Sequence, residues 1–530
     1  MKDAPHLSRR TFAIIAHPDA GKTTLTEKLL LASGAIRIAG EVKARGERRR
    51  ARSDWLAIEQ QRGISVTTSA MTFEKDGVTY NLLDTPGHED FSEDTYRTLT
   101  AVDSAVMVID AAKGIESQTL KLFEVCRLRD IPILTFVNKI DREGKDPFEL
   151  LDEVASRLAL DVAPMVWPMG SGANFRGCYD IVGKRVLLET SSTDRTYGRA
   201  EGVDGLDDPR FEAYAGADAA ATARSEIALA EAGYPAFDLD AFRAGAQTPV
   251  YFGSALREFA VGELLRDIGR YAPPPKSVAA AGREVKPSDP TVSGFVFKVQ
   301  ANMDPNHRDR VAFVRLCSGR FKRGMKLKNT RTDKLLAVNN PIFFFAQDRQ
   351  ILEEAVAGDI IGVPNHGVLA VGDTLSEIEG LRFTGLPDFA PEIIRRVRLA
   401  DPLKSKQMKK AIMGLAEEGA SQVFTPMLGA DTYVGVVGAL QLDVIEARMA
   451  AEYGVAAKLE TCGFDAARWL VSEDRAALDA FINSHKSSIA HDRFGDPVFL
   501  ARSAWEAKYE EERTKGVKFL KTRERLREAA

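Results

Sequence analysis

Residues 16–24 read Ala-His-Pro-Asp-Ala-Gly-Lys-Thr-Thr, and the rest of the architecture follows from them. The strand-forming residues 11–15 come directly before, and Leu25, Leu29 and Ala32 follow at helical spacing. This pattern indicates a strand-to-helix turn. In such a turn the backbone N–H groups and the positive end of the helix dipole converge on one anionic group. The sequence therefore predicts a phosphate-binding loop.

The loop matches the pattern G-x-x-x-x-G-K-[ST] except at its first position, where Ala16 replaces glycine. Gly21 lets the backbone approach a phosphate, Lys22 reaches the β- and γ-phosphates, and Thr23 offers its hydroxyl to Mg²⁺. Taken alone, the stretch also fits an ordinary strand-turn-helix. The candidate nucleotide-binding residues of this loop are Asp19, Ala20, Gly21, Lys22, Thr23 and Thr24.

A second motif, Asp84-Thr85-Pro86-Gly87-His88, follows the strand-like residues 78–83. A carboxylate at the end of a strand beside a phosphate loop is placed to hold Mg²⁺, here Asp84 acting through water. Gly87 has no side chain to shield its N–H from a γ-phosphate oxygen, and His88 stands beside the reacting centre. Without the preceding motif, a turn histidine bonded to the backbone would be the preferred interpretation of His88.

A third motif, Asn138-Lys139-Ile140-Asp141, follows the apolar strand 133–137. Asp141 can accept hydrogen bonds from both N1–H and the 2-amino group of guanine, a pair that adenine lacks. Losing that pair would leave a buried carboxylate without a partner, so the predicted base is guanine. A further strand, 250–253, ends at Ser254-Ala255, where a backbone N–H could meet the guanine O6.

The segment between the first helix and residue 67 carries weaker signals. Residues 43–52 contain six basic residues and one acid, a pattern that also suits a solvated helix face. Residues 61–67 follow, and a hydroxyl there could complete the Mg²⁺ shell when the γ-phosphate is present. Such a segment would be a nucleotide-ordered switch.

Bulk composition sets wide limits. A chain of 530 residues with 45% hydrophobic and 28% charged residues suits three or four globular domains. The four cysteines form no C-x-x-C pair, and no signal peptide or membrane span is evident, so a reducing, cytoplasmic setting is expected. The net charge of −4 neither requires nor excludes a local basic face for RNA.

The chain divides into three predicted domains. Residues 1–275 form the nucleotide domain, with an insertion near 170–245, and end at the proline-rich linker 271–276. Short strands with turns over 276–388 predict a β-barrel. Residues 389–530 begin with the strand and helix order of a ferredoxin-like α/β domain.

Two apolar helix stripes in this last part are interpreted as core, with no cofactor implied. The stripes are Met408, Ile412 and Leu415 on one helix and Leu440, Val444 and Ala447 on the other.

The final segment, 507–530, mixes eight basic with five acidic residues and predicts an exposed helix.

The combined motifs resemble the translational GTPases. Long stretches outside the nucleotide motifs, at 297–305, 307–313 and 417–424, look like the bacterial peptide chain release factor 3 family. The resemblance covers nearly the whole chain. It implies an α/β fold in which a P-loop GTPase domain with a mostly parallel sheet precedes a β-barrel and a ferredoxin-like domain.

The same resemblance implies the activity and the partners. It implies a GTPase that binds GTP or GDP with Mg²⁺, is activated by the ribosome, and drives class I peptide chain release factors off after the finished peptide is freed. We expect a monomer without a membrane or DNA partner. His88 would position the attacking water, and Ser65 aligns with the switch threonine, although Thr67 is an alternative Mg²⁺ ligand.

Ala16 occurs in other translational GTPases, elongation factor G among them, so it does not weaken the prediction of nucleotide binding. No arginine finger in cis is evident, so hydrolysis should be slow until a partner completes the site. Two alternatives are an elongation factor G-type translocase or ribosomal protection protein, and a GTP-regulated binding module in which hydrolysis is incidental. The first would be expected to continue into further domains.

Overall fold

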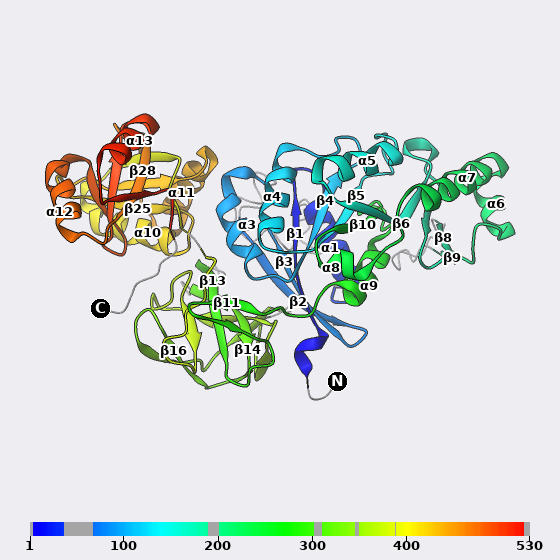
Figure 1. The fold of residues 1–530 in the computed structure, drawn as a ribbon, viewed down its shortest axis with the longest axis horizontal. Helices are drawn as coiled ribbons and strands as arrows, with labels where there is room; N and C mark the ends of the chain where they lie inside the picture. Colours follow the sequence, from blue (N-terminus) through cyan, green and yellow to red (C-terminus); the bar gives the residue numbers. More distant parts are fainter. Residues whose placement is uncertain are drawn as a thin grey trace.

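The computed structural model describes residues 4–36, 67–188, 201–301, 310–344, 349–386 and 388–523. Within these ranges the chain forms three parts, each built on its own large sheet (Figure 1). We call them the N-terminal domain (4–271), the middle domain (293–376) and the C-terminal domain (393–520). In Figure 1 the middle domain lies below the other two, and the C-terminal domain lies on the left.

Ten described strands of the N-terminal domain form one sheet. Its central strands run parallel, whereas the first and the last three pair antiparallel at the edges. In spatial order they are β2 (Ser69–Lys75), β3 (Val78–Asp84), β1 (Arg9–Ala16), β4 (Ser104–Asp110), β5 (Ile133–Asn138), β10 (Gln247–Phe252), β6 (Asp161–Met169), β7 (Gly177–Asp180), β8 (Arg185–Leu188) and β9 (Glu201–Val203).

The parallel strands are buried almost throughout. Every residue of β4 and β5 is buried, as expected where both faces of a parallel strand are covered. The carboxyl ends of β1, β3, β4, β5 and β10 therefore meet at one edge, where the sequence motifs were expected to gather. The covering helices are α1 (Lys22–Ser33), α3 (Ser92–Leu99), α4 (Ser117–Leu128), α5 (Pro147–Leu158) and α9 (Val261–Tyr271).

The predicted insertion extends this sheet at its far end. The antiparallel strands β7, β8 and β9 continue from β6, and a helical excursion follows before the chain returns as β10 (right-hand end of Figure 1). Phe211 and Ile227 of the excursion are buried in the same hydrophobic core as the parallel strands. The excursion consists of α6 (Pro209–Ala215), α7 (Ala217–Gly233) and α8 (Leu239–Arg243).

The middle domain is an antiparallel β structure, reached through the short hairpin β11 (Val278–Ala280) and β12 (Arg283–Val285). Eight of its described strands form one sheet, and β15 (Arg320–Lys322) pairs with β20 (Glu354–Val356) beside it. In spatial order the sheet contains β17 (Lys334–Ala337), β16 (Lys326–Asn329), β22 (Thr374–Ser376), β13 (Ser293–Ala301), β14 (Arg310–Ser318), β21 (Ile360–Pro364), β18 (Ile342–Phe344) and β19 (Arg349–Ile351).

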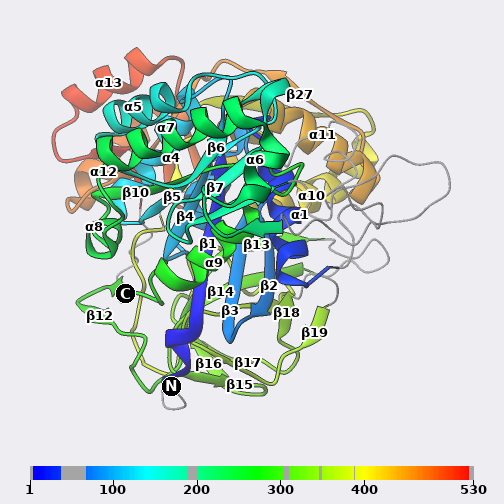
Figure 2. The same ribbon diagram turned by 90° about the vertical axis from the view of Figure 1, so that its right-hand side faces the viewer.

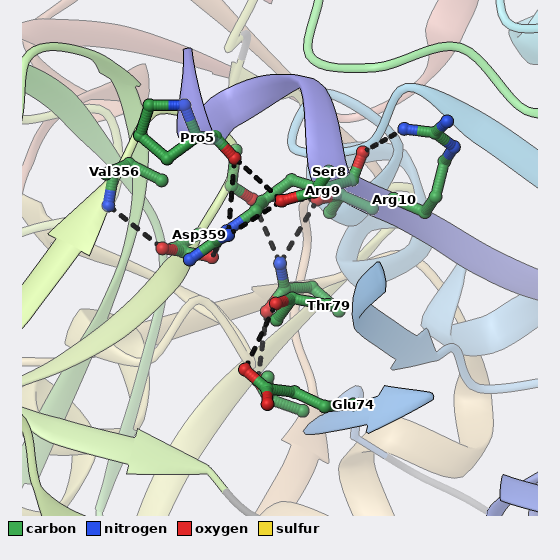
Figure 3. A network of polar contacts seen from close by, with 12 residues as sticks. Pro5, Ser8, Arg9, Arg10, Glu74, Thr79, Val356 and Asp359 are labelled. Carbon is green, nitrogen blue, oxygen red and sulfur yellow. Dashed lines mark hydrogen bonds and ion pairs between the residues drawn. The ribbon is translucent and has the colours of Figure 1, made fainter. Parts of the chain in front are cut away.

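Polar contacts join the middle domain to the start of β1 (Figure 3). Arg9 donates from Nε to Asp359 Oδ1 at 3.1 Å, and Asp359 Oδ2 accepts from the Val356 N–H at 2.9 Å. The Arg9 guanidinium also donates to Pro5 O at 3.2 Å. Because Asp359 is buried and meets both domains, this corner is fixed by specific polar contacts as well as by packing.

The C-terminal domain contains two successive βαββαβ units that share one sheet. In each unit the fourth strand lies beside the first, then the third, then the second, and the two second strands, β25 and β29, pair antiparallel. The first unit is β24 (Ile393–Leu399), α10 (Ser405–Glu417), β25 (Gln422–Pro426), β26 (Tyr433–Val436), α11 (Ala439–Tyr453) and β27 (Ala457–Thr461). The second is β28 (Ala466–Val471), α12 (Arg475–Ser484), β29 (Ile489–Asp492), β30 (Pro497–Ala501), α13 (Ala504–Arg513) and β31 (Lys518–Leu520).

Two sequence-based expectations for this domain are corrected. The predicted helix over 507–530 is wrong where the structure describes it, because α13 ends at Arg513 and β31 follows, with Phe519 in the core of the second unit. Residues 524–530 lie outside the described residues. The predicted core stripe of α11 is also wrong. Ile445 and Met449 face the core of the first unit, whereas Val444 packs against the N-terminal domain and Ala447 is exposed.

The turned view in Figure 2 places α10 and α11 behind the N-terminal sheet and the middle domain beneath it. The N-terminal domain therefore contacts both other domains. Its contacts with the middle domain include the start of β1, and its contacts with the C-terminal domain include the residues after β3.

Candidate nucleotide site

The loop between β1 and α1 has the backbone of a phosphate-binding turn. Gly21 caps the helix with φ +95°, a left-handed conformation that favours glycine. A Cβ at this position would lie 2.3 Å from Asn138 Nδ2, so glycine is also required by a close approach. Ala16 ends β1 and is buried, and Asp19 has φ +64°. Ala20 is buried, while Thr23 and Thr24 are partly exposed in the first turn of α1.

Lys22 and Asp84 form a buried ion pair. Lys22 Nζ lies 2.5 Å from Asp84 Oδ1, and the two side chains are 6% and 1% exposed. The other carboxylate oxygen, Asp84 Oδ2, is buried and has no hydrogen-bond partner among the described residues. An ion pair this deeply buried requires further partners for its remaining lone pairs.

The free oxygen of Asp84 suits a divalent cation. A buried carboxylate oxygen is the kind of ligand that Mg²⁺ prefers, and Mg²⁺ keeps several waters instead of using a full protein cage. Within the described ranges, no group of three or more His, Cys, Asp or Glu side chains is placed to hold a metal ion. Of the other expected ligands, Thr23 lies one residue after Lys22, and Ser65 lies outside the described residues.

The turn after β3 packs against the phosphate loop. Asp84 pairs with Ile14 of β1 in the parallel register, and Thr85 Oγ1 donates to Ile14 O at 2.7 Å. A Cβ on Gly87 would lie 3.7 Å from Ala16 O, so the two loops are in ordinary contact. Pro86 O accepts from Thr95 Oγ1 at 3.3 Å.

His88 begins the short helix η2 (Glu89–Phe91) and is 37% exposed. Its Nδ1 accepts a hydrogen bond from the Asp90 N–H at 3.2 Å. A neutral imidazole that accepts at Nδ1 carries its proton on Nε2, which makes Nε2 a donor. His88 therefore does bond the backbone of its own turn, while its other nitrogen can still donate to a ligand.

Asn138 connects three of the motifs. Its Nδ2 donates to Ala20 O at 2.9 Å, and its Oδ1 accepts from the Ala255 N–H, also at 2.9 Å. The phosphate loop, the third motif and the Ser254-Ala255 turn are thus held together by one buried amide. Asn138 therefore fixes these three loops relative to one another.

Lys139 extends along the same loop. Its Nζ donates to Asp19 O at 2.5 Å and to Asp110 Oδ2 at 2.7 Å. Burial alone would raise the pKa of Asp110, but the hydrogen bonds from Lys139 and Ala112 outweigh it and lower that pKa. The sequence analysis missed Asp110, although its place at the end of β4, opposite Asn138 of β5, was a usable signal.

Asp141 and Ser254 differ in their surroundings. Asp141 is partly exposed and has no hydrogen-bond partner within the described part of the chain. Ser254 is completely buried, and its Oγ accepts from the Arg257 N–H at 3.2 Å. The Ile140 N–H donates to Gly253 O at 3.3 Å, so the two turns lie side by side. The basic run 43–52 and residues 62–64 lie outside the described residues.

Comparison with known proteins identifies the family. The Elongation factor Tu GTP binding domain model matches residues 7–274, Elongation factor G domain 2 matches 291–378, and Class II release factor RF3, C-terminal domain, matches 383–511. The chain is 52% identical over 517 residues to peptide chain release factor 3 of Nitrosomonas europaea, covering 97% of this chain and 96% of that protein. The chain belongs to the peptide chain release factor 3 family.

Membership of the release factor 3 family makes this chain a translational GTPase of translation termination that binds guanine nucleotide. The predicted family resemblance and the predicted fold class are both confirmed. A protein of Thermus thermophilus with a known crystal structure shares the fold, with a TM-score of 0.68 and 24% identity over 88% of this chain and 69% of that one. In the described residues, no helix has the length and apolar character needed to cross a membrane.

Proposed function

We propose that this chain hydrolyses GTP on the ribosome and uses the resulting change of shape to drive class I peptide chain release factors off the ribosome. Its partners are then the ribosome and those release factors, and it acts as a monomer in the cytoplasm. The observation that supports this proposal best is the convergence of Lys22, Asp84 and Asn138 at one edge of the sheet, beside the loop between β1 and α1. Each comes from the end of a different parallel strand or the helix that follows it.

The phosphate end of the proposed site is formed by the first two motifs. Lys22 leaves its ion pair with Asp84 and turns to the β- and γ-phosphates when a triphosphate enters. Asp84 and Thr23, with Ser65 or Thr67, would hold Mg²⁺, which would supply positive charge to the phosphate groups. The Gly87 N–H donates to the γ-phosphate. This exchange of partners leaves neither buried charge unpaired.

The base end is formed by the third motif and the turn after β10. Asp141 accepts from N1–H and the 2-amino group of guanine, a role that suits a carboxylate with no partner in the described chain. The Ala255 N–H at present donates to Asn138 Oδ1, so contact with guanine O6 requires Asn138 to share or yield that donor. Lys139 covers the loop beside Asp19.

His88 acts as the residue that positions the attacking water. In this arrangement the Asp90 N–H occupies Nδ1 of the neutral ring, so Nε2–H is the group that can donate to the water once the ring has turned toward the γ-phosphate. No cationic side chain in the described residues takes the place of an arginine finger in the three motifs, so the ribosome completes the site.

The test is GTP turnover with and without ribosomes that carry a bound class I release factor, measured together with loss of that factor. We expect strong stimulation by the loaded ribosome and release of the factor during turnover. His88→Ala should keep GTP affinity but lose stimulated turnover by about 100-fold or more, the scale of a lost positioning group. Absence of stimulation would favour a GTP-regulated binding module instead.

A further inference from the structure

The turn that carries His88 lies against the first turn of α11 in the C-terminal domain. Asp90 Oδ2 accepts a hydrogen bond from the Leu440 N–H at 2.6 Å, although the two residues are 350 positions apart. Phe91 packs on Val444 and Leu440 in a small apolar cluster of its own. A carboxylate at this place satisfies one of the unpaired N–H groups that begin every helix.

This contact explains the α11 stripe that the sequence analysis assigned to the core. Leu440 and Val444 are apolar because they pack on Phe91 of another domain, while Ile445 and Met449 face their own core. Gly438 completes the arrangement. A Cβ there would lie 2.0 Å from Asp90 Cγ, and its backbone, with φ −134°, is one that any residue adopts. Gly438 is therefore needed for close approach alone.

Asp90 contacts His88 as well as α11. The Asp90 N–H donates to His88 Nδ1, and Asp90 Oδ1 lies 3.6 Å from the same nitrogen. One residue thus fixes the ring through its backbone and holds the C-terminal domain through its carboxylate. Movement of α11 away from Asp90 would break the Leu440 hydrogen bond, which helps to hold η2 and its N-terminal cap, His88, in place.

We propose that Asp90 is a positioning residue that keeps His88 in a resting orientation while α11 is docked, and that undocking of α11 frees His88 for hydrolysis. This inference rests on the proposed role of His88. The coupling is reciprocal, because any ligand that rearranges the turn weakens the docking of α11 by the same free energy.

Other contacts keep the C-terminal domain attached when this one is lost. Arg97 of α3 donates to Gly419 O at 3.4 Å and lies 3.6 Å from Asp388 Oδ1. A change confined to the Asp90 contact should therefore shift the docking equilibrium and leave the three domains folded.

The experiment uses the full chain with Gly438→Ala, which pushes α11 off Asp90 and changes no residue of the three nucleotide motifs. Gly463→Ala is the matched control, because a Cβ there meets no atom within 4 Å. We expect Gly438→Ala to raise GTP turnover in the absence of ribosomes by about five- to tenfold, within the usual range of coupling energies. The control should turn over GTP at the parent rate.

Two further variants decide whether the effect passes through this contact. Asp90→Ala removes the carboxylate from the opposite side without adding volume, and it should raise ribosome-independent turnover in the same direction. If thermal unfolding shows that Gly438→Ala does not fold, Asp90→Ala alone tests the inference. In the double variant Gly438→Ala/His88→Ala the gain should vanish, because a non-additive pair marks a shared route.

Three results would overturn the inference. These are turnover in folded Gly438→Ala equal to or below the control, lowered turnover in Asp90→Ala, or a gain that survives His88→Ala. Failure of the proposed function looks different. In that case His88→Ala alone would leave ribosome-stimulated turnover intact, whatever Gly438→Ala does.

Discussion

Arg315 of the middle domain donates to Asp103 Oδ2 of the N-terminal domain at 2.6 Å, and both side chains are almost completely buried. Asp103 Oδ1 accepts in addition from the Lys276 N–H at 3.0 Å, and Arg315 donates to Gly358 O at 2.5 Å. Both charged side chains therefore have hydrogen-bond partners besides each other at this interface. By contrast, the C-terminal domain meets the N-terminal domain through the smaller contacts of Asp90, Phe91 and Arg97.

Replacing Arg315 should destabilise the joint between the first two domains. Arg315→Met leaves Asp103 buried without its cation, which costs about 3–5 kcal/mol. Arg320→Met is the matched control. Its ion pair with Glu354 is about half exposed, and such pairs contribute about 0–1 kcal/mol. Urea unfolding of both variants measures the difference, and equal midpoints would show that the buried pair contributes little.

Gly21 should not accept a side chain. In Gly21→Ala the positive φ would strain the backbone by about 1–3 kcal/mol. The new Cβ would also lie 2.3 Å from Asn138 Nδ2. We expect guanine nucleotide affinity to fall by about 100-fold or more, which corresponds to about 3 kcal/mol. The measurement is a titration with a fluorescent GDP.

Gly34 is the control for this substitution, because it also has a positive φ but a Cβ there would meet no atom within 4 Å. Gly34→Ala should cost about 1 kcal/mol of stability at the end of α1 and leave nucleotide affinity unchanged. Similar losses of affinity in both variants would mean that α1 as a whole, and not the Gly21 approach, controls binding.

The three motifs were predictable because each lies at the carboxyl end of a parallel strand. Parallel strands bring these ends to one edge, so the sequence positions of Gly21, Asp84 and Asn138 imply proximity without coordinates. The same argument could have predicted that Asp110, at the end of β4, lies beside Asn138. The two hydrogen bonds of the Asn138 side chain could not be predicted, because the sequence does not show which loop its oxygen and its nitrogen face.

The C-terminal domain shows what pattern alone leaves undecided. An apolar stripe such as Leu440 and Val444 indicates that a helix face is covered, but not whether its own domain or another covers it. The second βαββαβ unit was missed, although its strands β28 and β30 are no shorter than β25 and β27 of the first unit. The charged residues on both sides of β31 hid that strand, whose Phe519 is buried in the core of the second unit.

The base specificity proposed for Asp141 can be tested by changing which base it pairs with. Asp141→Asn offers an N–H₂ donor where the carboxylate accepted, so it should repel the 2-amino group of guanine and favour the 2-carbonyl oxygen of xanthine. We expect GTP affinity to fall by about 100-fold or more, the effect of leaving polar groups unpaired, with a gain for xanthosine triphosphate. Competition binding measures both, and unchanged GTP affinity would remove Asp141 from the base site.

The cysteines provide a test of packing that does not depend on nucleotide. All four lie in the described residues, and none is in a disulfide. Burial raises the pKa of Cys126 and of Cys317 to about 12, and raises that of Cys178 well above its ordinary value. At pH 8 a thiol of pKa 12 is ionised in about one molecule in 10,000, and the thiolate is the reactive form.

Iodoacetamide at pH 8 should therefore label Cys462 first, because it alone is partly exposed, although burial raises its pKa too. The other three should react only as fast as the protein opens, and all four should react at once in urea, which serves as the control. Mass spectrometry of timed digests gives the order. Rapid native labelling of Cys126 or Cys178 would mean that the N-terminal core opens far more readily than its complete burial of these thiols implies.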